Sequence, residues 1–112
     1  MIRGHELVSK ISKKEFFSKV KPFPKEDIEV TDHALFRLNQ KQRKIFEGDI
    51  LKDFILDKEP IEIGVQSNDN LAVLYNYEGE KVLKIIIRFS SNKIYIVSFY
   101  ILNVYQMKEI RK

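Results

Sequence analysis

Hydrophobic and polar residues alternate regularly through most of the C-terminal half of the chain. After Pro60, large apolar residues recur at every second position in four segments, which the polar turns SNDN, EGE and SSN separate. A period of two is typical of strands. The pattern therefore predicts four consecutive strands, at residues 61–66, 71–77, 81–89 and 94–102. Because the turns are short, we expect these strands to pair antiparallel as a meander.

The last two strands are the most apolar, and each has one face without charge. Regular alternation gives the face made of Leu83, Ile85, Ile87 and Phe89, and the face made of Tyr95, Val97, Phe99 and Ile101. The opposite face then carries Lys84, Arg88, Ser98 and Tyr100. A turn one residue shorter would pair Arg88 with Tyr95 and exchange the faces of the last strand.

The period changes to about 3.6 before Pro60, which predicts helices. A short helix is expected at residues 12–20, because Ser12 precedes Glu15 at a capping-box spacing. Two principal helices are expected within residues 32–46 and 49–57. A short edge strand is favoured at Ile28 and Val30, and Thr31 or Asp32 can cap the helix that follows. The predicted fold class is α+β, with N-terminal helices packed on a four-stranded antiparallel meander sheet.

Composition restricts the class of protein. A chain of 112 residues suffices for one domain with a modest core. It has no cysteine, which excludes disulfides, thiolate nucleophiles and zinc–thiolate sites. No apolar run reaches the roughly 18 residues that span a bilayer, and the stretch MIRGHELVSKISKKEFF lacks the continuous apolar run of a secretory signal. We therefore expect a cytoplasmic protein with no membrane partner.

Positive charge is concentrated near the N-terminus. Residues 1–44 hold 11 of the 20 lysines and arginines but only 6 of the 16 acidic residues. The net charge of +4 and this distribution suit a polyanionic partner.

The stretch TDHALFRLNQKQRK, at residues 31–44, contains the candidate chemistry of the helical half. On a helix its polar side would carry His33, Arg37, Lys41 and Lys44. Histidine exchanges protons near neutral pH, and an arginine one turn away can hold a phosphate. A solvated helix with a packed or capping histidine would have the same pattern. On the sheet, Lys84, Arg88, Ser98 and Tyr100 suit a phosphodiester, although a one-sided sheet also shows polar groups to water.

Metal and cofactor chemistry has little support in the sequence. The two histidines are far apart, and the carboxylates at Asp49, Asp53 and Asp57 have no histidine beside them. There is no glycine-rich phosphate loop and no nucleophile elbow. We expect neither a metal nor a cofactor.

The order of elements resembles a known group. A short strand, HALFR at the start of a helix, a second helix and a meander ending in IVSFYIL resemble small uncharacterised domains marked by HA, two residues and R, which are grouped with the RelE, ParE and BrnT toxins. The resemblance covers about residues 27–103. His33 and Arg37 match its motif. This chain departs from the group at Gln42-Arg43-Lys44-Ile45, where the group often has an Arg-Gly-Ile step.

The resemblance implies a single RelE/BrnT-like domain at residues 27–112, with residues 1–26 as an N-terminal extension that contains the short helix. It also implies a metal-independent endoribonuclease in which the ribose 2′-hydroxyl attacks the phosphodiester. His33 would be the general acid or base, Arg37 and Arg88 would stabilise the phosphate, and Tyr100 would donate a proton or stack. The implied catalytic set is His33, Arg37, Arg88, Ser98 and Tyr100, and the implied RNA contacts are Lys41, Lys44 and Lys84.

The expected partners are RNA, including ribosome-bound mRNA, and a cognate antitoxin protein; the sequence does not determine the oligomeric state. ParE-like relatives share the fold without ribonuclease activity, so fold alone does not carry function. A non-catalytic nucleic-acid-binding module and a protein-interaction module therefore stay open as alternatives.

Overall fold

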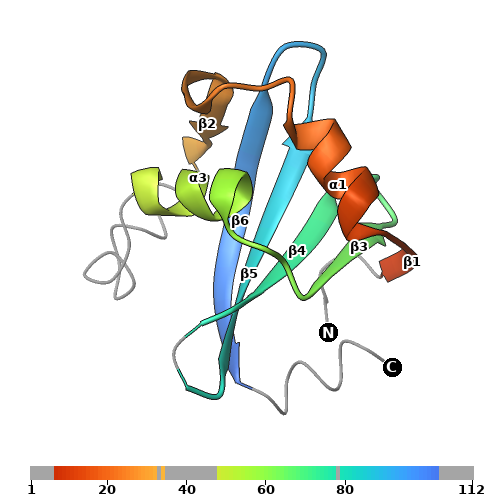
Figure 1. Cartoon of the computed structure of the whole chain (residues 1–112), viewed down its shortest axis with the longest axis vertical. Coiled ribbons are helices and arrows are strands. Elements are labelled where there is room, and N and C mark those ends of the chain that lie inside the picture. Colours follow the sequence, from red (N-terminus) through yellow and green to blue (C-terminus); the bar gives the residue numbers. More distant parts are fainter. Residues whose placement is uncertain (1–6, 33, 35–47, 78, 104–112) are drawn as a thin grey trace.

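Six strands form one sheet, and the helices α1 and α3 lie on the same face of it (Figure 1). A computed structural model describes residues 7–32, 34, 48–77 and 79–103. Its elements are β1 (Leu7–Ile11), α1 (Lys13–Val20), a 3₁₀ turn η1 (Lys25–Asp27), β2 (Ile28–Val30), α3 (Gly48–Asp57), β3 (Glu62–Gln66), β4 (Leu71–Asn76), β5 (Lys81–Phe89) and β6 (Ile94–Asn103). Across the sheet the order is β1-β3-β4-β5-β6-β2.

The fold class predicted from the sequence is wrong. We expected N-terminal helices on a four-stranded antiparallel meander, whereas the sheet has six strands and mixed pairing. The two α-helices that lie wholly within the described residues are short, with 8 residues in α1 and 10 in α3. The four predicted strands are present as β3 to β6, each within one residue of its expected limits. The edge strand favoured at Ile28 and Val30 is confirmed as β2. The error lies in the number of strands in the sheet and in the mixed pairing at its edges.

Both edges are built from the N-terminal part of the chain. β1 pairs antiparallel with β3, and β2 pairs parallel with β6. A meander of four strands would leave β3 and β6 with unpaired backbone N–H and C=O groups, and added edge strands pair these groups. Residues 7–20, assigned from the sequence to an extension, therefore supply one edge of the sheet and one helix of its cover.

Helix α1 begins as the sequence predicts. The Ser12 hydroxyl accepts a hydrogen bond of 3.0 Å from the backbone N–H of Glu15, which is the N-cap contact. Phe16 and Val20, one turn apart, are buried in the core. Lys21, the C-cap, is still in helical geometry and its N–H donates to the carbonyl of Phe17 at 2.9 Å. The helix ends there because Pro22 has no backbone N–H to continue the series of hydrogen bonds.

Helix α3 confirms the expected amphipathic helix near residues 49–57. Leu51 and Ile55, one turn apart, are fully buried. The ring of Phe54 packs edge-on against the ring of Tyr75 on β4, with 5.3 Å between their centroids. None of the helices in the described part of the chain is both long and apolar enough to cross a bilayer.

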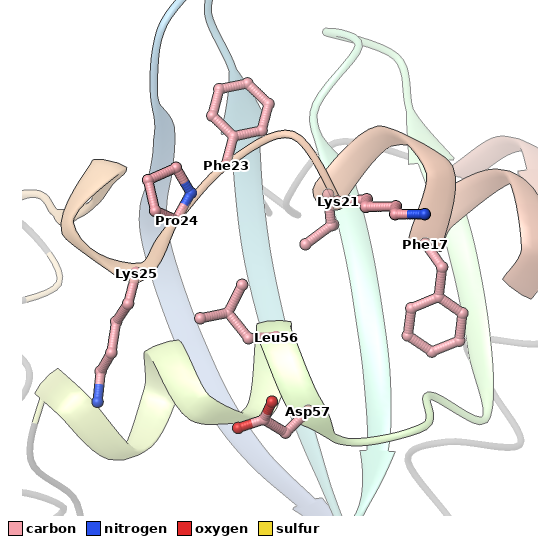
Figure 2. Close-up of a pocket in the computed structure, with 8 residues that line it drawn as sticks. Phe17, Lys21, Phe23, Pro24, Lys25, Leu56 and Asp57 are labelled. Atoms are coloured by element: carbon pink, nitrogen blue, oxygen red, sulfur yellow. The ribbon is translucent and has the colours of Figure 1, made fainter.

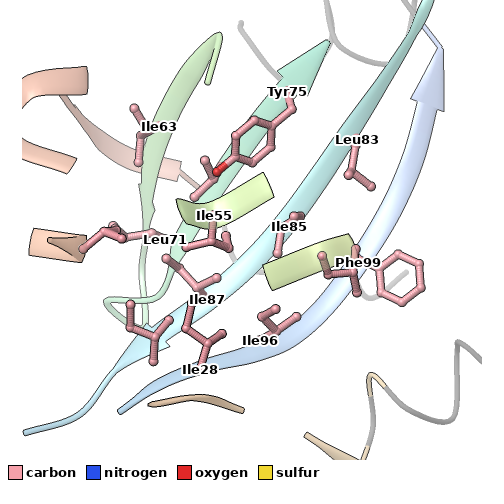
Figure 3. Close-up of a cluster of buried hydrophobic side chains, with 14 of the residues drawn as sticks. Ile28, Ile55, Ile63, Leu71, Tyr75, Leu83, Ile85, Ile87, Ile96 and Phe99 are labelled. Atoms are coloured by element: carbon pink, nitrogen blue, oxygen red, sulfur yellow. The ribbon is translucent and has the colours of Figure 1, made fainter. Parts of the chain in front are cut away.

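The main core lies between the helices and one face of the sheet (Figure 3). Ile63, Val73, Ile85 and Phe99 are register partners across β3, β4, β5 and β6, and all four are buried. The opposite face is also largely covered, since Leu74 and Ile86, which lie on it, are only 2% and 6% exposed. The sheet is therefore not the one-sided sheet that simple alternation suggests.

The expected helix at residues 32–46 lies outside the described residues, except for Asp32 and Ala34. Ala34 is fully buried in the core cluster.

Candidate functional site

A β-bulge in β6 decides which side chains share the polar face of the sheet. Ile86 pairs with Ser98 and Ile87 pairs with Ile96, so Val97 is one extra residue on β6. An extra residue shifts the alternation by one position. Residues 94 and 96 therefore face the core together with residue 99, and all three are fully buried. The predicted core position of Tyr95 is wrong, because the bulge turns it to the other face.

The bulge is anchored to the chain that follows β2. The Thr31 hydroxyl donates to the carbonyl oxygen of Val97 at 3.2 Å, and the Thr31 N–H donates to the carbonyl of Ile96 at 3.1 Å. The same hydroxyl accepts from the N–H of Ala34 at 3.3 Å, as an N-cap does. Thr31 therefore stabilises the β-bulge of β6, and its hydroxyl also acts as the N-cap of the segment that follows.

Two cations and two aromatic rings lie in register on β5 and β6. Lys84 pairs with Tyr100, and its Nζ is 5.8 Å from the centroid of the tyrosine ring. Arg88 pairs with Tyr95, and its Cζ is 5.2 Å from the centroid of that ring. Both distances suit a cation–π contact. We call Lys84, Arg88, Tyr95 and Tyr100 the cation–aromatic strip.

The strip is extended along the strands. Residues 84 and 88 are four apart on β5, which separates them by about 13 Å at the usual rise per residue. Each cation lies beside one tyrosine ring, so the strip presents a positive charge next to a flat apolar surface at two places along its length. A ligand that fits it would itself alternate negative charge with flat groups.

Lys84 is the most perturbed group of the strip. It is half-buried, and desolvation lowers the pKa of its ammonium group. No carboxylate among the described residues lies within ion-pair distance of Lys84. The nearest acidic side chain in its row is Glu62, two strands away, and Glu62 contacts Lys10 at 3.4 Å. A partly desolvated cation without a counter-ion favours binding of an anion.

Ser98 lies on the same face of the sheet but is not available to a polymer. It is 4% exposed, and its hydroxyl is buried with no hydrogen-bond partner among the described residues. The structure thus brings together three of the residues singled out from the sequence, Lys84, Arg88 and Tyr100. His33, Arg37, Lys41 and Lys44 lie outside the described residues.

Sequence reasoning missed Tyr95 as a site residue. The only signal for it was the alternative register, in which Arg88 pairs with Tyr95. Because of the β-bulge, both registers occur in the same strand pair. The original register holds for residues 98–103 of β6, and the alternative register holds for residues 94–96. Among the residues the structure describes, no group of three or more histidine, aspartate or glutamate side chains is placed to hold a metal ion.

Comparison with known proteins identifies a family. A sequence model of the MJ0788 family matches residues 6–87, well over half of the chain. No curated protein and no solved structure matches the chain. The family name states no activity, substrate or partner, so a function has to be argued from the chemistry of the site.

Proposed function

The chain belongs to the MJ0788 family, and we propose that it binds single-stranded RNA across the cation–aromatic strip. The observation that carries the proposal is Lys84, a half-buried ammonium group with a lowered pKa and no carboxylate of the described residues within ion-pair distance. An ordinary solvating lysine would extend into water and keep its hydration. The partial burial of this one costs hydration free energy, which the contact with the Tyr100 ring offsets in part and a bound phosphate would offset further.

Single-stranded RNA matches the pattern of the strip. Its phosphates supply the negative charge for Lys84 and Arg88, and its unpaired bases can stack on the rings of Tyr95 and Tyr100. A duplex hides the faces of its bases, so it would use the cations alone. We therefore expect a preference for single strands over duplexes of the same sequence.

Two phosphate contacts set the expected salt dependence. For single strands the slope of log K against log salt is about 0.7 per neutralised phosphate, so the strip alone contributes about 1.4. Removing one cation should reduce the slope by about 0.7. Removing one stacking ring should weaken binding by about 1–3 kcal/mol with little change in slope.

Fluorescence anisotropy with a labelled single-stranded RNA tests the proposal. Lys84→Gln and Arg88→Gln should each weaken binding and flatten the salt slope, and Tyr95→Ala should weaken binding only. Lys14→Gln is the matched control, because it removes one charge from an exposed position on α1, over the other face of the sheet. If Lys14→Gln weakens binding as much as Lys84→Gln does, the attraction comes from net charge and the strip is not the site. Equal affinity for single-stranded DNA would leave the strip in place but remove the assignment to RNA.

Cleavage of the bound RNA, as in RelE and BrnT toxins, is a further hypothesis. None of the matches reported above is a RelE, ParE or BrnT protein, so it rests on the HA-x-x-R motif of His33 and Arg37 and on Lys84. A lysine with a lowered pKa is a better proton acceptor near neutral pH than an ordinary one. A cognate antitoxin would belong to the same hypothesis.

The cleavage hypothesis has its own test. Purified protein is incubated with RNA in EDTA, and the same RNA carries a single 2′-deoxy nucleotide at the cut position in a parallel reaction. Attack by the 2′-hydroxyl predicts cutting in the first reaction and none in the second. His33→Ala should reduce the rate by about 10²–10⁴-fold. Binding without cutting of free or ribosome-bound RNA would leave a non-catalytic RNA-binding module.

A further inference from the structure

A second surface lies on the helical face of the sheet, in a groove between α1 and α3 (Figure 2). Its volume is about 400 Å³. The floor and walls are mainly apolar, and the lining residues are Phe17, Val20, Lys21, Phe23, Pro24, Lys25, Leu56 and Asp57. The groove is separate from the cation–aromatic strip, which lies on the other face.

Contacts at both ends of the groove fix its walls. Lys13, at the start of α1, pairs with Glu59 beyond the end of α3 at 2.9 Å. Lys25 pairs with Asp53 of α3 at 3.0 Å. Each exposed ion pair stabilises the protein little. The walls are held mainly by the core, in which Val20 of α1 and Leu51 and Ile55 of α3 are buried. The groove is therefore formed before a ligand arrives.

Two exposed charges of opposite sign line the groove. Neither Lys21 nor Asp57 forms an ion pair within 4 Å of another residue that the structure describes, although the charge of Asp57 also acts on Lys25, which is paired with Asp53. Between them lies apolar surface, and Phe17 leaves 37% of its area exposed. The groove thus offers a positive point, a negative point and an apolar floor. Its complement is an apolar group that lies between an acidic group and a basic group.

We propose that this groove binds a short peptide segment of a partner protein, in which large apolar side chains lie between one acidic and one basic residue. The acidic side chain pairs with Lys21 and the basic one with Asp57. A small molecule usually has most of its surface enclosed by its pocket. Here the rim at Phe17, Pro24 and Asp57 is open to water, which suits a chain that enters and leaves.

Three peptides titrated into the ¹⁵N-labelled full chain test the proposal by NMR. The first is Glu-Gly-Leu-Phe-Gly-Lys, the second has Glu at both ends and the third has Lys at both ends. The first should bind best and shift the amide signals of Phe17, Leu56 and their neighbours. Changing its Leu and Phe to Ala should weaken binding by about tenfold or more.

Charge reversal in the protein makes the test specific. In Lys21→Glu both residue 21 and residue 57 are negative, so the peptide with two lysines should become the best ligand. In Asp57→Lys both residues are positive, so the peptide with two glutamates should become the best ligand. Each matched pair is expected to gain about two- to fivefold. Both residues are exposed, so the spectra away from the groove should stay unchanged. Equal binding of all peptides to all variants, signals that move only on β5 and β6, or no binding at millimolar concentration would each overturn the proposal.

Discussion

Replacing Tyr75 by phenylalanine should stabilise this protein, although most substitutions in a core do the opposite. Tyr75 is 1% exposed, and its hydroxyl is buried without a hydrogen-bond partner in the part of the chain that the structure describes. Leaving a polar group buried and unpaired costs about 1–3 kcal/mol. Tyr75→Phe removes that cost and keeps the ring that packs at 5.3 Å against Phe54.

The opposing effect is small. Removing one oxygen atom leaves a space of roughly 15 Å³, which costs about 0.4 kcal/mol at the usual price per unit of cavity volume. The free energy of unfolding should therefore rise by about 1–2 kcal/mol. For a domain of this size that corresponds to a melting temperature higher by about 4 °C or more.

The dependence on pH gives a second measurement. Burial raises the pKa of the Tyr75 hydroxyl well above its ordinary value of 10.0. The unfolded chain then loses this proton at a lower pH than the folded chain does, so Tyr75 favours unfolding as the pH rises above 10. Tyr75→Phe lacks this effect. The stability gap between variant and wild type should widen above pH 10, by up to about 1.4 kcal/mol per pH unit.

Urea denaturation of both proteins from pH 7 to pH 11, with differential scanning calorimetry at pH 7, measures both effects. Tyr95→Phe is the control, because Tyr95 is partly exposed and its change should stay within about 0.5 kcal/mol. A Tyr75→Phe protein less stable than wild type, or a gap that stays constant above pH 10, would show that the hydroxyl has a hydrogen-bond partner in solution.

Three further substitutions test other parts of the structure. Ser98→Ala should leave RNA affinity unchanged in anisotropy and raise the melting temperature slightly, because its hydroxyl is buried and forms no hydrogen bond with any residue that the structure describes; a loss of binding would mean that the face opens to the ligand. Gly79→Ala should cost about 1–2 kcal/mol in urea denaturation, since residue 79 has φ of +59° and nothing lies near an added Cβ, so only backbone strain acts. A cost near zero would place residue 79 outside the left-handed region. Thr31→Val should lose about 1–2 kcal/mol, because one hydroxyl serves both Val97 and Ala34. Stability equal to that of wild type would mean that neither hydrogen bond contributes.

The four central strands could be predicted because their alternation is long and strict. The short edge strand favoured at Ile28 and Val30 is present as β2, but its parallel pairing with β6 could not be predicted, because that pairing depends on a distant partner. The other edge strand, at residues 7–11, could not be predicted for the same reason. The N-cap at Ser12 and the helix at residues 48–57 were predictable for the opposite reason, because their signals are local.

The site was predictable only in part. Lys84, Arg88 and Tyr100 share a face, as regular alternation predicts. The bulge at Val97 could not be predicted, because the residues on both faces of the segment IYIVSFYIL are mostly apolar, so a change of face leaves no mark in the sequence. Alternation also assigns a face without saying whether that face is covered, which is why Ser98 was taken for a surface residue. The predictions for His33, Arg37, Lys41 and Lys44 stay predictions.

The parallel pairing of β2 with β6 has a consequence for the order of folding. Residues 28–30 reach their partners only through residues 94–96, near the end of the described chain. During synthesis on a ribosome, β2 therefore cannot pair until more than sixty further residues have been made. The hairpins of β3, β4 and β5 can form before that point. Closing a loop of that length costs on the order of 4 kcal/mol in chain entropy. The Thr31 contacts to Ile96 and Val97 should accordingly form late, and substitutions there should change the unfolding rate more than the folding rate.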